Sequence, residues 1–122
     1  MYKRQRKYNN YEEFCQVVQY IIDLYQQPEV IVSGGHVDKY GHTKPGTDTL
    51  AWRYATENNI HMIEHNALWE VYGRGAGPIR NKLIVEDSNI LLAFVSPESI
   101  GTLNTIKLAQ EKGIVVHQYN IR

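Results

Sequence analysis

Apolar residues recur at helical spacing near the start of the chain. The positions are Phe14, Val17, Val18, Ile21 and Tyr25. Asn10 followed three residues later by Glu13 resembles a capping box, which marks the start of a helix. The helix should end before Pro28, because a residue that precedes proline disfavours helical angles. This pattern predicts one amphipathic helix with its apolar face on a core.

Short apolar runs and further helical patterns alternate along the rest of the chain. The runs predict strands at 30–32, 60–63, 90–95 and 114–116. The intervening helices are expected to begin at Thr47 or Asp48, near Pro78, and at Gly101 or Thr102. The run at 90–95 is apolar throughout, as in a strand that is covered on both faces. This alternation predicts an α/β fold with a mainly parallel sheet.

Composition narrows the class of protein. The length of 122 residues predicts a single domain over 1–122. The 13 Lys and Arg balance the 13 Asp and Glu, so neither nucleic acid nor a membrane is an expected partner. Cys15 is the sole cysteine, which excludes an internal disulfide, and it is expected to be a buried, inert thiol. With no apolar run near the roughly 20 residues of a membrane span, we expect a cytoplasmic protein.

Glycine-bearing loops follow three of the expected strands. They are Ser33 to Gly35, Trp69 to Gly77, and Ser96 to Thr102. In parallel α/β folds such loops lie at the carboxyl edge of the sheet, where ligands bind. None of the three is a dinucleotide fingerprint or a Walker phosphate loop. The pattern therefore predicts a ligand site of another kind at this edge of the sheet.

The glycine-rich run 73–81 carries the clearest candidate chemistry. Its bare backbone would let a ligand approach closely, and Pro78 suits the first turn of a helix. Arg80 and Asn81 would then lie in that turn, beside free N–H groups that favour a phosphate or carboxylate. The alternative is a glycine-rich turn with a solvated arginine.

Three sequence pieces together resemble the SLOG superfamily, in its small branch related to YspA and cpYpsA. The first piece holds Ser33, Gly34, Gly35, Gly46, Asp48 and Ala51. The second holds Ala67, Trp69, Tyr72, Gly73, Ala76, Gly77, Pro78, Arg80 and Asn81. The third holds Ala93, Phe94, Gly101 and Thr102. The resemblance implies a three-layer α/β/α Rossmann-like sandwich.

The resemblance also implies binding of a nucleotide or a nucleotide-derived small molecule, in a sensor or sequestering module without a cofactor. The implied ligand-binding residues are Ser33, Gly34, Gly35, Asp48, Trp69, Tyr72, Gly73, Arg74, Gly77, Arg80, Asn81, Gly101 and Thr102. In this scheme Arg80 pairs with a phosphate and Asn81 holds a ribose or phosphate oxygen. Asp48 either accepts from a ribose hydroxyl or caps a helix. Trp69 and Tyr72 either face a base or pack under the loop.

Two departures from the family pattern bear on activity. An insertion at 36–45 brings His36, Asp38 and His42 to the expected edge, either as a polar surface loop or as a metal site. In the related LOG phosphoribohydrolases a glutamate acts at the glycosidic bond, and Thr105 stands at its place here. We therefore expect a binding module without catalysis.

The enzymatic alternative is a nucleotide N-glycosidase of the LOG type. It needs a carboxylate at the glycosidic bond, for which the sequence offers Asp38, Asp48 and Glu98. Binding of single-stranded DNA, as in DprA proteins, requires a basic groove, and the balanced charge does not indicate one.

The start of the chain departs from the family as well. Residues 1–5 form no apolar strand, although family members open with one, and Met-Tyr-Lys-Arg-Gln can be encoded by the end of a sequencing adapter. We expect these residues to be non-native and a strand to be missing before them, with a natural divergent start as the alternative. The tyrosine-rich segment after Asn10 is compatible with pairing into a homo-oligomer.

Overall fold

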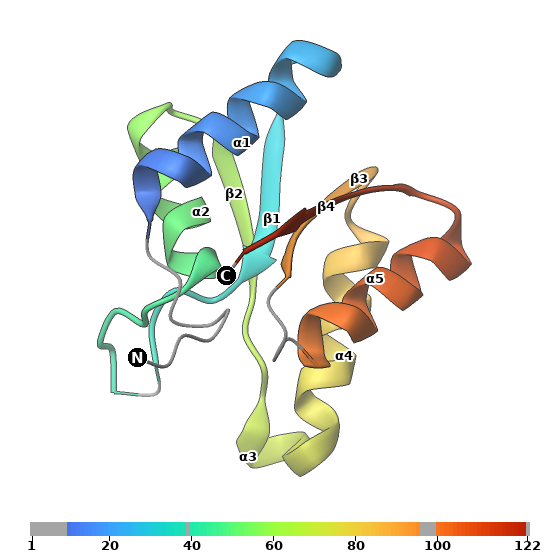
Figure 1. Cartoon of the computed structure of the whole chain (residues 1–122). Coiled ribbons are helices and arrows are strands. Elements are labelled where there is room, and N and C mark those ends of the chain that lie inside the picture. The colour runs from blue at the N-terminus through green and yellow to red at the C-terminus, as the bar shows by residue number, and fades with distance from the viewer. Residues whose placement is uncertain (1–9, 39, 96–99, 122) are drawn as a thin grey trace.

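The computed structural model describes residues 10–38, 40–95 and 100–121 (Figure 1). Its helices are α1 (Tyr11–Leu24), α2 (Thr47–Glu57), α3 (Trp69–Tyr72), α4 (Ala76–Glu86) and α5 (Ile100–Lys112), with a 3₁₀ turn, η2 (Gly73–Gly75). Its strands are β1 (Val30–Gly34), β2 (His61–His65), β3 (Ile90–Val95) and β4 (Val115–Asn120). The fold is mixed α/β, as predicted. The expectations for residues 1–5 and for Ser96 and Glu98 fall outside the described residues.

The strands form two parallel pairs. β1 pairs with β2 from Val30↔His61 to Gly34↔His65. β3 pairs with β4 from Ile90↔Val115 onward. The parallel pairing confirms that part of the sequence prediction, but the described strands form two two-stranded sheets and not the one sheet expected. Each pair is joined by a helix, as parallel strands require.

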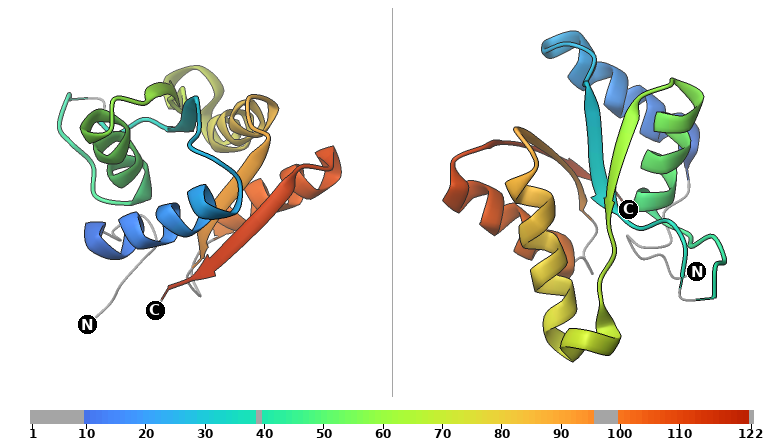
Figure 2. Two further views of the ribbon diagram at one scale, coloured as in Figure 1. Left: turned by 90° about the horizontal axis from the view of Figure 1, so that it is seen from above. Right: turned by 180° about the vertical axis from the view of Figure 1, so that it is seen from behind.

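The helices cover the strands from two sides (Figures 1 and 2). Helices α1 and α2 lie on one side of β1, and α4 packs on the same strand from the other side. Helix α5 packs on β3 and β4 and lies beside α4. This placement leaves the carboxyl end of β1 between α2 and α4.

Phe14 of α1 lies at the centre of the main core. Its ring stacks on Phe94 of β3, with 5.2 Å between centroids, and meets the edge of Tyr54 of α2. Only 4% of Phe14 is exposed. Cys15 packs against this core but is only half-buried, so the expectation of a buried thiol is too strong. Among the described residues, no helix is long and apolar enough to span a membrane.

The predicted cap residue is confirmed for α1 and wrong for α2. Asn10 caps α1 as predicted, because its side chain accepts the N–H of Glu13. In contrast, Gly46 is the cap residue of α2, with φ 125° and no side-chain cap bond. The prediction that Thr47 or Asp48 caps this helix is wrong, because the Asp48 carboxylate is bonded to another segment.

The segment before α4 is helical instead of a loop. The chain leaves α3 at Gly73, whose φ of 56° breaks the helix, and passes through η2. Helix α4 then begins at Ala76, which is only 1% exposed. The close packing at this position leaves room only for a small residue. Arg80 and Asn81 therefore lie in the second turn of α4, and their predicted place in the first turn is wrong.

Three strands are longer than predicted at their carboxyl ends. β1 extends through Ser33 and Gly34, which were expected to belong to the loop. β2 runs two residues further, to His65, and β4 extends to Asn120. Each extension continues the parallel register of the partner strand, a tertiary constraint that a short apolar run does not reveal. The ends of β1 and β2 thus become part of the candidate site.

Candidate functional site

Side chains from α2 and α4 meet over Gly34 at the carboxyl end of β1. Asp48 Oδ1 accepts the Gly34 N–H at 3.0 Å. A Cβ at Gly34 would lie 2.7 Å from Arg80 Nη1 and 2.7 Å from Asp48 Oδ2. A bare glycine is therefore required for the guanidinium and the carboxylate to approach the backbone here.

An amide chain fixes the Arg80 side chain. Arg80 Nε donates to Asn81 Oδ1 at 2.9 Å, and Asn81 Nδ2 donates to Asn104 Oδ1 of α5 at 3.3 Å. Asn81 is only 7% exposed. Because Nε is held by this chain, the Nη edge of Arg80 is oriented toward Gly34.

An imidazole, a carboxylate and an indole form the other side of the site. His36 Nδ1 lies 2.6 Å from Glu64 Oε2, which also accepts the His36 backbone N–H at 3.0 Å. The His36 ring stacks on Trp52 of α2, with 4.2 Å between centroids and 8° between planes. The side chains of His36 and Glu64 are 18% and 25% exposed, so the pair is held at a partly buried position.

Gly35 is covered by a polar side chain from the next strand end. A Cβ at Gly35 would overlap Asn66 Oδ1, so a larger residue there would have to displace this amide. Asn66 follows directly after β2. The floor between the two sides of the site is consequently bare backbone, edged by amide and carboxylate oxygens.

The geometry offers one cation and one acceptor to a ligand. None of the ion pairs within 4.0 Å among the described residues includes Arg80, so its Nη edge can pair with an anion. Asp48 Oδ2, whose sister oxygen is held by Gly34, can accept from a hydroxyl. A molecule carrying both a phosphate or carboxylate and a hydroxyl suits this combination.

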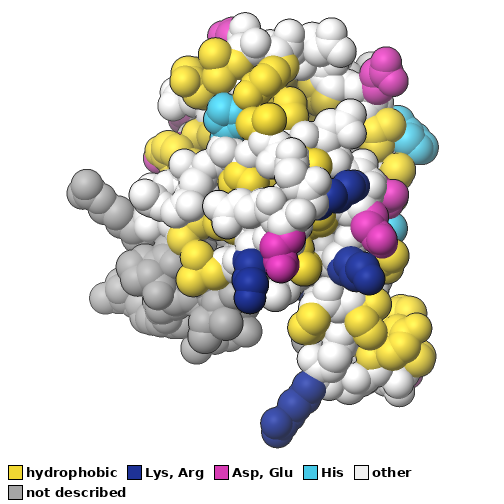
Figure 3. Space-filling model, turned by 90° about the vertical axis from the view of Figure 1, so that its right-hand side faces the viewer, with side chains coloured by type: hydrophobic (Ala, Val, Ile, Leu, Met, Phe, Trp, Pro, Cys, Tyr) yellow, Lys and Arg dark blue, Asp and Glu magenta, His cyan; other side chains and the backbone are white. Residues whose placement is uncertain are grey.

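The other predicted site residues are less well placed to contact a ligand at Gly34. Ser33 is buried, and its hydroxyl donates to the Gly34 carbonyl. The segment that holds Tyr72, Gly73 and Arg74 projects beyond the strands at the foot of Figure 1. Val71 of α3 is 68% exposed. Figure 3 shows hydrophobic side chains gathered on the lobe at the lower right, at the foot of the molecule.

Four further predicted positions complete the placement. Gly77 is buried in α4, and Trp69 begins α3, but its side chain lies outside the described part of the chain. Gly101 and Thr102 lie in the first turn of α5. Among the predicted residues the structure brings Gly34, Asp48, Arg80 and Asn81 together.

The insertion forms a small hairpin. Val37 and Thr43 form an antiparallel bridge, and Asp38 Oδ1 accepts the N–H groups of Tyr40 and His42. The bond from the His42 N–H, followed by that from Tyr40, lowers the pKa of Asp38. No group of three metal-ligating side chains occurs in the described residues. Asp38 is thus a turn-stabilising residue.

Sequence reasoning missed four residues that build the site. They are Trp52, Glu64, Asn66 and Asn104. Glu64 and Asn66 had a signal, because a polar residue at the end of an expected parallel strand lies at the ligand edge. The contacts of Trp52 and Asn104 depend on tertiary packing and leave no local pattern.

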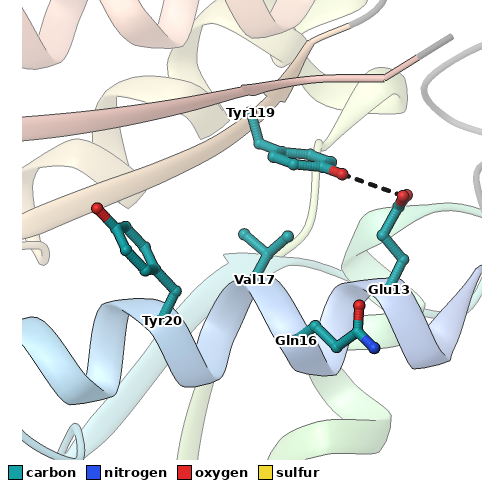
Figure 4. Close-up of a pocket in the computed structure, with 5 residues that line it drawn as sticks. All are labelled: Glu13, Gln16, Val17, Tyr20 and Tyr119. Atoms are coloured by element: carbon teal, nitrogen blue, oxygen red, sulfur yellow. Dashed lines mark hydrogen bonds between the residues drawn. The ribbon is translucent and has the colours of Figure 1, made fainter.

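A separate groove lies between α1 and β4 (Figure 4). Its volume is about 380 Å³, and it is lined by Glu13, Gln16, Val17, Tyr20 and Tyr119. The Tyr119 hydroxyl donates to Glu13 Oε2 at 3.0 Å, which raises the pKa of Tyr119. The lining residues that the structure describes include a carboxylate and no Lys or Arg, so they do not suit an anion.

Comparisons with known proteins give one relative. The "Gene 61 protein" of Mycobacterium phage D29 is 35% identical over 71 residues, which are 57% of this chain and 57% of the phage protein. The match thus spans little more than half of the relative, and it supports a bacterial or phage origin. No family model and no solved structure matches the chain.

Proposed function

We propose that this chain binds a nucleotide or a nucleotide-derived small molecule at the carboxyl end of β1, as a sensor or sequestering module. The observation that carries the proposal is the meeting of Arg80 Nη1 and Asp48 Oδ2 over the bare Gly34. A guanidinium pairs with phosphate through a planar fork, and a carboxylate accepts hydroxyl protons from a sugar. A sugar phosphate supplies both groups within one small molecule.

The arrangement of the chain supports the finer expectation for the fold. The units β1–α2–β2 and β3–α5–β4 are parallel strand–helix–strand units, with helices on two sides of the strands. We propose that they belong to a three-layer Rossmann-like sandwich of the SLOG type. The placement of Gly34, Asp48 and Arg80, all part of the SLOG resemblance, at one carboxyl edge supports this proposal.

Binding without catalysis is favoured over N-glycosidase activity. Of the carboxylates nominated for that reaction, Asp38 is occupied by two backbone N–H groups in the hairpin turn. One carboxylate oxygen of Asp48 is already occupied by the Gly34 N–H. Glu98 lies outside the described residues.

Calorimetric titration with AMP, cyclic AMP and ADP-ribose tests the proposal. We expect at least one of them to bind, and Arg80→Ala to weaken its binding about 10- to 100-fold, the loss of a charge-assisted pair. Arg74→Ala is the matched control, because Arg74 is an exposed arginine on η2, away from Gly34. Equal loss in both variants, or no binding of any probe, would overturn the proposal.

A further inference from the structure

The insertion brings a second acceptor to the side of Asp48. His36 is the first residue of the insertion and lies two residues after Gly34. The antiparallel bridge between Val37 and Thr43 and the bond from the Lys44 N–H to the His36 carbonyl fix its backbone. His36 therefore enters the site at a defined position.

Helix α2 sets the spacing between His36 and Asp48. Asp48 and Trp52 are four residues apart on α2, so their side chains share one face of the helix. Asp48 contacts Gly34, and Trp52 stacks on His36. The residue that contacts Gly34 and the residue that stacks on His36 are thus one helical turn apart, ~5.4 Å along the axis of α2.

The hydrogen bonds of Glu64 determine which nitrogen of His36 carries the proton. Glu64 Oε2 accepts the His36 backbone N–H, so this oxygen acts as an acceptor. The Nδ1 of the same histidine, 2.6 Å from Oε2, must then donate to it. In the neutral ring Nε2 is left as an acceptor, and it has no partner among the described residues.

We propose that His36 Nε2 accepts the 2′-hydroxyl and Asp48 Oδ2 the adjacent 3′-hydroxyl of a ribose, so that the site takes ribonucleotides in preference to 2′-deoxyribonucleotides. This inference rests on the proposed function and names the sugar of its ligand. Two hydroxyls that each donate over ~2.7 Å span two acceptors about one helical turn apart. Arg80 holds the phosphate of the same molecule.

The inference assigns separate roles to three side chains. His36 reads a hydroxyl, Glu64 fixes the tautomer of His36, and Trp52 fixes the plane of its ring. Removing Nε2 while keeping a flat ring should therefore abolish discrimination between sugars without removing phosphate binding. His36→Phe is such a change, and the backbone N–H of residue 36 can still donate to Glu64.

The experiment is calorimetric titration of the full chain with AMP and with 2′-deoxy-AMP. The wild type should bind AMP about 10-fold more tightly, the effect of one hydrogen bond. His36→Phe should reduce this ratio to about one while leaving the affinity for 2′-deoxy-AMP unchanged. Glu64→Gln, which no longer fixes the tautomer, should lower the ratio partly. His61→Phe, at the exposed start of β2, is the matched control and should keep the wild-type ratio.

The outcomes separate this inference from the function on which it rests. Equal binding of the two nucleotides by the wild type would overturn the inference and leave nucleotide binding standing. A ribose preference that survives in His36→Phe would also overturn it, because Asp48 alone would then read the sugar. If neither nucleotide binds a folded wild type, both proposals fail.

Discussion

The Asp48 carboxylate accepts the backbone N–H of Gly34 at 3.0 Å, across 14 residues of sequence. This bond ties the first turn of α2 to the carboxyl end of β1. It occupies one carboxylate oxygen and leaves the other facing Arg80 Nη1 over the bare Cα. One hydrogen bond thereby serves both the strand–helix connection and the candidate ligand site.

Gly34→Ala tests the need for this bare backbone. The new Cβ would displace the ends of two flexible side chains, those of Arg80 and Asp48. Stability should therefore change by no more than about 1 kcal/mol, while nucleotide binding is lost. Gly75→Ala is the control, because the nearest atom to its Cβ, Ile79 Cδ1, lies at 4.0 Å. Melting curves and calorimetry on both variants provide the measurement.

Substitutions at Arg80 separate binding from folding. Arg80→Ala should lower ligand affinity with little change in melting temperature, because none of the ion pairs within 4.0 Å among the described residues includes the guanidinium. Arg80→Lys should restore only part of the affinity, since an ammonium lacks the planar fork. A large fall in melting temperature with unchanged affinity would show that Arg80 is a structural residue.

Phe14→Ala should be the most damaging single change on α1. Phe14 is 4% exposed and contacts both Phe94 and Tyr54. Removing a buried aromatic ring costs about 3–5 kcal/mol. Tyr20→Ala on the same helix should cost much less, because Tyr20 is 60% exposed. Urea unfolding of the two variants measures the difference, and equal midpoints would contradict the core assignment.

The hairpin of the insertion should weaken in acid. Two backbone N–H groups, His42 first, hold the pKa of Asp38 below its usual value. A lowered pKa in the folded state means that this stabilisation is present above the ordinary Asp pKa of about 3.9 and is lost as the pH falls through the lower folded value. NMR titration of the Tyr40 and His42 amide signals should give a midpoint below ~3.9. Asp38→Asn should remove that titration.

Sequence patterns predicted correctly those helices and strands that depend on neighbouring residues alone. The capping of α1 by Asn10 and the strand at 90–95 follow from neighbouring residues, and both are present. The start of α4 was expected near Pro78 and lies at Ala76, because Gly77 favours a loop by propensity whereas it is buried within the helix. Propensity is overridden there by close contact around Ala76.

In the candidate site, too, some features follow from the local sequence and others depend on tertiary contacts. The predicted Gly34, Asp48, Arg80 and Asn81 do come together. The sequence pattern could not reveal that Asp48 bonds a strand instead of its own helix, or that Glu64 holds His36, since these contacts join distant segments. Strand register decides which polar residue faces which loop.

The most direct test of nucleotide binding at β1 is an NMR titration of the ¹⁵N-labelled chain with AMP, following the Arg80 side-chain Nε–H and the Gly34 and Gly35 amides. The Nε–H already donates to Asn81, so a phosphate on the Nη edge should shift its signal. We predict saturable shifts of these three signals at a common dissociation constant. Shifts confined to the α1–β4 groove around Tyr20 and Tyr119, with these three unmoved, would contradict the account.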